Sequence, residues 1–96
     1  MKKLTPSSYL QQDPEISARE FDGETVMMDK SLENYFGLDE IGTRIWQILE
    51  QKHTMLELCE KLTQEYNVDK EQCLHDITPF VEGLLSDELL IIHDEE

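Results

Sequence analysis

The chain has 96 residues, a length that fits one domain with a thin hydrophobic core. Hydrophobic residues make up 39% and charged residues 31%, which is typical of a globular protein, and no apolar run is long enough to cross a membrane. The net charge of −14 disfavours nucleic acid and anionic membrane surfaces as partners, and would attract a basic peptide or protein. Because no apolar stretch follows Lys2 and Lys3, there is no secretory signal, and we expect a cytoplasmic protein.

The first 38 residues divide into an arm and a sheet. Residues 1–14 are polar and contain two prolines, so we expect a flexible N-terminal arm. Three short strands are then predicted at residues 15–21, 25–28 and 33–38. Asp22 and Gly23 are a strong turn signal between the first two strands. The three strands predict an antiparallel meander, which needs another element packed on one face to be stable.

Helical periodicity begins at residue 39 and continues towards the end of the chain. Asp39 is placed to cap a first helix, whose apolar residues share one face. Thr54 and Glu57 have the spacing of a capping box at the start of a second helix. Both patterns are those of amphipathic helices that pack on a core.

A third helix is predicted to be the longest. Residues 69–72 have the pattern of a second capping box, and a long apolar stripe follows them. Pro79 lies inside this stripe, so we expect a kink near residues 75–79 or a break into two shorter helices. Residues 89–92 predict a short strand or a cover over the core, and residues 93–96 predict a frayed acidic tail. This order of elements is the outline of a winged-helix-like α+β domain.

The sequence contains no recognisable catalytic or metal-binding motif. His53, His75 and His93 are far apart, and Cys59 and Cys73 belong to no metal-ligand pattern. There is also no glycine-rich phosphate loop and no serine-nucleophile motif. We therefore predict no enzyme activity, no metal and no cofactor. Because both cysteines fall on helical apolar stripes, they are expected to be buried free thiols.

Several short motifs follow one another along the chain in a defined order. They are Asp-Gly-Glu-Thr-Val-Met-Met-Asp at 22–29, Tyr-Phe-Gly-Leu-Asp-Glu-Ile-Gly at 35–42, Ile-Trp-Gln-Ile-Leu at 45–49, Thr-Met-Leu-Glu-Leu at 54–58, Glu-Tyr-Asn-Val at 65–68, Asp-Ile-Thr-Pro-Phe-Val at 76–81, and two Leu-Leu pairs at 84–85 and 89–90. This set resembles the PqqD family over about residues 15–92. The aromatic and Ile-Trp motifs are most similar to the standalone precursor-recognition proteins of lasso-peptide pathways. Pro79 and the Ser-Asp-Glu at 86–88, where the family often has a glycine, depart from the family pattern.

The resemblance implies both a fold and a function. The fold is a winged-helix-like domain at residues 15–92, with a three-stranded antiparallel sheet followed by three helices. The function is that of a non-catalytic adaptor, which binds the leader of a ribosomally synthesised precursor peptide. It presents the leader to a modifying enzyme, either a radical SAM enzyme or a leader protease. The leader adds as a strand beside the third strand and packs against the third helix, a mode known as β-augmentation.

The implied peptide-binding residues come from the third strand and the third helix. They are Glu33, Asn34, Tyr35, Phe36, Gly37, Leu38, Cys73, Asp76, Ile77 and Phe80. Tyr35 and Phe36 point to opposite faces of a strand, so one should enter the core while the other lines a groove or shields the sheet. Ile77 and Phe80 lie on a stripe that must serve both core and groove, and Asp76 beside them either binds the leader or is solvated.

Two other functions stay open on the sequence alone. A winged-helix DNA binder would present residues 70–85 to DNA. This helix has one basic residue, Lys70, and three acidic residues, so DNA phosphates would repel the helix. The second alternative is an interaction domain that docks on an enzyme without binding a leader. It would need the same exposed strand edge as a leader-binding protein.

Overall fold

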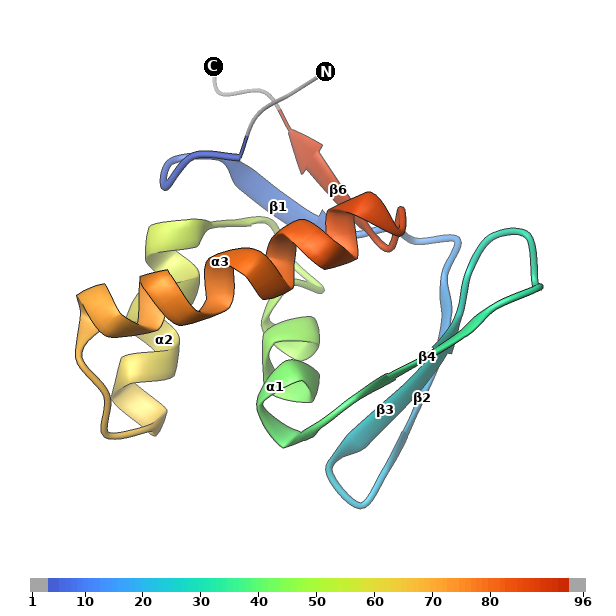
Figure 1. Cartoon of the computed structure of the whole chain (residues 1–96), viewed down its shortest axis with the longest axis horizontal. Helices are drawn as coiled ribbons and strands as arrows, with labels where there is room; N and C mark the ends of the chain where they lie inside the picture. The colour runs from blue at the N-terminus through green and yellow to red at the C-terminus, as the bar shows by residue number, and fades with distance from the viewer. Residues whose placement is uncertain (1–3, 94–96) are drawn as a thin grey trace.

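The computed structural model of the chain describes residues 4–93 and has six strands and three helices in this range (Figure 1). In chain order they are β1 (Tyr9–Gln12), β2 (Ser17–Phe21), β3 (Glu24–Met28), β4 (Tyr35–Leu38), α1 (Glu40–Ile48), β5 (His53–Thr54), α2 (Met55–Glu65), α3 (Lys70–Ser86) and β6 (Leu90–His93). The predicted α+β arrangement, an antiparallel meander followed by three helices, is confirmed. The structure adds a second sheet that the sequence did not indicate.

The predicted meander is the sheet β2–β3–β4, in which β3 is the central strand. Asp22 and Gly23 form its first turn with positive φ angles of 51° and 82°, the backbone geometry that joins two strands tightly. Thr25 and Met27 of β3 point into the core and are 1% exposed each, while Val26 between them is 43% exposed. This alternation fixes which face of the sheet packs against the helices.

The second sheet has the order β5–β1–β6 and joins the two ends of the described chain. The expectation of a flexible arm over residues 1–14 is wrong for Tyr9–Gln12, because this segment pairs with two strands and the Leu10 side chain is fully buried. Residues 1–3 of the expected arm and 94–96 of the expected tail lie outside the described residues. His93 belongs to β6 rather than to a tail, and the strand expected within residues 89–92 is present.

The helix starts follow the capping residues. The Asp39 carboxylate accepts a hydrogen bond from the Gly42 N–H at 2.8 Å, at the start of α1. Thr54 and Glu57 form the predicted capping box of α2, with two bonds of 3.0 Å. Asp69 caps α3 by accepting from the backbone of Gln72 at 3.3 Å, whereas the Gln72 side-chain amide donates forward along the helix.

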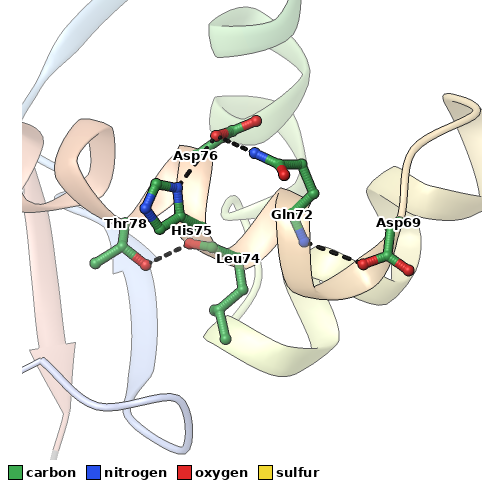
Figure 2. Close-up of polar contacts among 6 residues, drawn as sticks. All are labelled: Asp69, Gln72, Leu74, His75, Asp76 and Thr78. Carbon is green, nitrogen blue, oxygen red and sulfur yellow. Dashed lines mark hydrogen bonds and ion pairs between the residues drawn. The ribbon is translucent and has the colours of Figure 1, made fainter.

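Pro79 neither ends nor divides α3. The helix continues from Lys70 to Ser86, so the expected break into two shorter helices is wrong. Pro79 has no N–H to donate to the carbonyl four residues earlier. The residue just before it, Thr78, donates its hydroxyl to the Leu74 carbonyl at 2.6 Å, which gives this part of the helix an additional polar contact (Figure 2).

The hydrophobic core lies between the two sheets and the three helices. Its fully buried members include Leu10 of β1, Ile45 of α1, Leu58 of α2 and Val81 of α3. Cys59 and Cys73 are buried and free, as expected, and burial raises the pKa of the Cys59 thiol to about 12. Within residues 4–93, no helix is both long and apolar enough to cross a membrane.

Candidate peptide-binding site

Strand β4 lies at an edge of its sheet. One side of β4 pairs with β3 in the register Met28–Tyr35, Met27–Phe36, Val26–Gly37 and Thr25–Leu38. No described strand pairs with its other side. An unpaired strand edge presents backbone N–H and C=O groups in a row and can accept another strand.

The alternation of the ladder identifies the backbone groups at this open edge. The Asp29 N–H donates to the Asn34 C=O at 3.1 Å, so these two opposite residues are a hydrogen-bonded pair. Phe36 comes two residues after Asn34, so it also belongs to a hydrogen-bonded pair, and its backbone N–H and C=O groups point toward β3. Tyr35 and Gly37 occupy the alternate, non-hydrogen-bonded positions opposite β3, so their N–H and C=O groups face the open edge.

The side chains of β4 divide between the core and the outer face. Phe36 is half-buried and packs against the core, while Tyr35 is 71% exposed on the opposite face. Leu38 is 6% exposed and ends the strand in the core. The expectation that only one of the two aromatic residues enters the core is confirmed. Gly37 adds no side chain to the outer face, where its partner Val26 is exposed.

Asp29 holds the turn that precedes β4. Its carboxylate accepts from the Asn34 side-chain amide at 2.8 Å, from the Ser31 hydroxyl at 2.9 Å and from the Glu33 N–H at 3.1 Å. The Asn34 bond is the largest cause that lowers the pKa of Asp29 to about 2. Glu33 and Asn34, predicted within the strand, therefore lie in its preceding turn. The turn fixes where β4 begins.

Helix α3 contributes one partly exposed aromatic side chain next to the end of β4. Phe80 is half-buried, and its ring reaches so close to Gly42 that a Cβ there would lie 3.0 Å from the ring Cζ and 3.2 Å from the Leu38 Cβ. Phe80 and Leu38 therefore meet at the start of α1. Ile77 and Cys73 are 7% and 6% exposed, so most of each side chain serves the core.

Asp76 lies on the exposed side of α3, with 60% of its side chain accessible. Its Oδ1 accepts from the Gln72 Nε2 at 2.9 Å and lies 3.5 Å from the Nδ1 of His75 (Figure 2). Both neighbours come from the same helix, so the carboxylate is oriented locally and its other oxygen is available to a ligand. This geometry suits a solvated residue as well as a peptide contact.

The surface between the open edge of β4 and the flank of α3 that carries Phe80, called the interval below, is bounded at both ends. At one end, Phe80 packs on Gly42. At the other end, residues 29–31 of the turn and residues 86–88 after α3 line a notch of about 330 Å³. Figure 1 shows α3 crossing above α1, with the β2–β3–β4 sheet beside them. The open edge of β4 and the flank of α3 that carries Phe80 thus belong to one part of the surface.

Basic side chains are scarce around this interval. Residues 33–40 contain three acidic residues and no lysine or arginine, and α3 has no lysine or arginine after Lys70. Lys70 itself is paired with Glu60 at 3.0 Å. Of the other cations, Lys30 pairs with Asp13 at 2.8 Å and Arg44 with Glu65 at 2.7 Å. The interval is therefore negatively charged, which favours a ligand with lysine or arginine. In the described part of the chain, no group of three or more metal-ligating side chains is found.

The structure brings together part of the predicted set. Residues Tyr35–Leu38 and Phe80 share one region, while Ile77 and Cys73 lie mainly in the core behind it. Sequence reasoning missed Gly42, which gives Phe80 its room. The signal for it was weak, a glycine inside an expected helix where this residue disfavours helix formation.

Comparisons with known proteins identify a matching family and several similar structures. The family model described as Coenzyme PQQ synthesis protein D (PqqD) matches residues 24–90. The chain is similar to TbiB1, solved in complex with the TbiA(beta) leader peptide, with 29% identity, a TM-score of 0.78, and coverage of 88% of this chain and 99% of that chain. It is also similar to a lasso peptide synthetase B1 complexed with its leader peptide, with 27% identity, a TM-score of 0.73, and coverage of 85% and 96%.

A more distant structure shares the fold. The PqqD truncation of Methylobacterium extorquens PqqCD, described as a stand-alone recognition element for ribosomally synthesised peptides, is 20% identical, with a TM-score of 0.77 and coverage of 93% of this chain and 95% of that chain. Among curated proteins no sequence match is found. Since the family model spans most of the chain, from β3 to the start of β6, this protein belongs to the PqqD family.

Proposed function

We propose that this protein is a non-catalytic adaptor that binds the leader of a ribosomally synthesised precursor peptide by strand addition at β4. The observation that carries the proposal is the open edge of β4, where the backbone groups of Tyr35 and Gly37 stand unpaired by any described strand beside Phe80 of α3. Backbone hydrogen bonds at such an edge supply affinity, and neighbouring side chains supply selectivity.

The similar structures support this choice of ligand. TbiB1 and the lasso peptide synthetase B1 were each solved with a leader peptide, and this chain covers nearly all of both. The peptide we propose is an extended segment that places an apolar side chain on Phe80 and a basic side chain near the acidic residues of the interval. Asp76, with one oxygen free of helix contacts, is the carboxylate we propose for that basic side chain.

The bound leader would be presented to an enzyme of the same pathway, either a radical SAM enzyme or a leader protease, in the cytoplasm. The chain itself would contribute binding and orientation, not chemistry. The DNA-binding alternative is further weakened by the ion pair between Lys70 and Glu60, because the single cation of α3 is already engaged.

An NMR titration tests the proposal. The probe is a synthetic leader of a precursor peptide of the same pathway, and a scrambled leader of the same composition is the control. We expect the amides of residues 35–38 to shift most and those of Tyr35 and Gly37 to exchange more slowly with solvent when the leader is bound. Shifts that cluster instead on residues 41–49 of α1 or on residues 4–14 would refute this site and favour the alternative of an enzyme-docking domain.

A further inference from the structure

A second groove lies on the flank of α3 that carries Leu85, and it shares Lys30, Ser86 and Glu88 with the notch at one end of the interval. It occupies about 860 Å³ between the C-terminal half of α3, strand β6 and the turn after β3. Leu4, Leu85 and Ile92 are half-buried residues on its walls. A concave apolar surface of this volume is large enough to receive several side chains of a partner.

Helical geometry separates the two surfaces of α3. At about 100° per residue, Leu85 lies about 140° round the helix axis from Phe80, and Glu82 lies about 160° from it. Val81 lies between the two flanks and is fully buried in the core. A ligand on the Phe80 flank that stops short of the notch at residues 86–88 therefore leaves the Leu85 flank uncovered.

Acidic side chains surround the second groove. Glu82 and Glu88 line it, and Asp13 contributes a carboxylate that is paired with Lys30 at 2.8 Å. Burial is the largest single influence on Asp13 and opposes its ionisation, but the contact with Lys30 and the hydrogen bond from the Glu15 N–H together lower the pKa of Asp13. Among the described residues on its walls, the carboxylates of Asp13, Glu82 and Glu88 outnumber the one basic side chain, Lys30, which pairs with Asp13 and also attracts Glu88, so these walls keep a net negative charge.

We propose that this second groove docks the pathway enzyme to which the adaptor delivers its leader, through an apolar side chain of the enzyme flanked by lysine or arginine. The inference rests on the proposed function, since an adaptor must hold peptide and enzyme together. The charge of the groove selects this occupant. A second copy of the chain would bring another net charge of −14 against the same carboxylates and be repelled. The two flanks of one helix would then place enzyme and leader side by side.

The test measures two affinities on the same variants. The probes are a purified leader protease or modifying enzyme of the same pathway, and a synthetic leader peptide alone, each titrated by calorimetry. Glu82→Lys reverses one exposed charge on the groove and Leu85→Glu places a charge on its apolar wall. We expect each to weaken enzyme binding about tenfold or more while leader affinity stays within about twofold. Glu50→Lys, the same charge change at the end of α1, is the control and should bind both like the unaltered chain.

The outcomes are distinguishable. If both groove variants bind the enzyme with unaltered affinity, the docking proposal is wrong, whatever the leader does. If they lose leader affinity instead, the groove belongs to the leader and the proposal is also wrong. A concentration-dependent dimer of the unaltered chain that Leu85→Glu abolishes would assign the groove to a second copy and overturn it. Because Glu82 is exposed, its variant decides the matter even if Leu85→Glu unfolds.

Discussion

Phe80 and Gly42 approach each other so closely that a Cβ at residue 42 would force its neighbours to shift by a few tenths of an ångström. A Cβ placed there would lie 3.0 Å from the ring Cζ of Phe80, 3.2 Å from the Leu38 Cβ and 3.3 Å from the Asp39 Oδ1. Each of these neighbours would have to move, and the ring is the neighbour with the most freedom. Gly42 thus lets α3 pack on the junction between β4 and α1.

Gly42→Ala should therefore destabilise the fold by about 1–3 kcal/mol, because overpacking outweighs the gain of up to about 1 kcal/mol expected for alanine in a helix. Gly83→Ala is the matched control, since a Cβ at residue 83 meets no atom within 4 Å. Urea unfolding measures both. Gly83→Ala should be neutral or stabilising, and a similar gain for Gly42→Ala would show that Phe80 yields freely.

Gly37 allows the strand-addition hypothesis to be tested through the backbone. Its N–H faces the open edge of β4, so proline at this position removes a donor toward the leader but none toward β3. We expect Gly37→Pro to fold and to weaken leader binding about tenfold or more. Gly37→Ala keeps the N–H, and nothing lies within 4 Å of the added Cβ, so it should bind the leader normally. Equal leader affinities for the two variants in calorimetry would rule out a backbone contact at this residue.

The helices were predictable because their signals are local. Asp39, Thr54 and Asp69 each accept from a backbone N–H within three residues, so capping can be recognised in a short stretch of sequence. The meander was predictable for the same reason, since its first turn needs the two residues at 22 and 23. Strand β1 carries no such signal. It has four residues with one fully buried leucine, and its partners lie far along the chain.

The features of the candidate site also differ in whether local sequence could predict them. The exposed Tyr35 and half-buried Phe36 follow from strand alternation, which is local. The contact between Phe80 and Gly42 joins residues that only the packed fold brings together, and the groove beside Leu85 likewise needs strand β6 in place. Of the two outcomes predicted for Pro79, a kink or a break, the break is wrong, because the buried Ile77 and Val81 on either side of Pro79 hold one continuous helix against the core.

Leu10 tests whether β1 is an integral part of the fold. Its strand lies between β5 and β6 and its side chain is fully buried in the core, so Leu10→Ala should cost about 2–5 kcal/mol of unfolding free energy. Leu56→Ala is the control, because Leu56 of α2 is 41% exposed and should change stability by no more than about 0.5 kcal/mol. Thermal or urea unfolding gives both values. If Leu10→Ala costs no more than the control, residues 9–12 act as an arm after all.

Asp29 gives the turn before β4 a pH dependence. The pKa of its carboxyl is lowered from 3.8 to about 2, first by the Asn34 side chain, so ionised Asp29 favours the folded turn. Its contribution is complete above the ordinary pKa and is lost as the pH falls from about 4 towards 2. An NMR titration of the Asp29 carboxyl carbon should have its midpoint near 2, with amide exchange at residues 33–34 rising in that range. A midpoint near 3.8 would contradict the four hydrogen bonds that the Asp29 carboxylate accepts, and Asp29→Asn should abolish the dependence.

The charge of the interval between β4 and α3 leads to the last prediction, which concerns how fast the leader associates. With a net charge of −14 and no lysine or arginine among residues 33–40, the protein should attract a leader that carries basic residues. Salt screens exposed charges over about 8–10 Å at physiological strength. We therefore expect the association rate in stopped flow to fall about tenfold or more between about 50 and 500 mM salt, while the dissociation rate changes little. A leader with its lysines and arginines replaced by glutamine is the control and should associate slowly at every salt concentration. Association of the natural leader that ignores salt would mean that backbone and apolar contacts at β4 and Phe80 act without electrostatic steering.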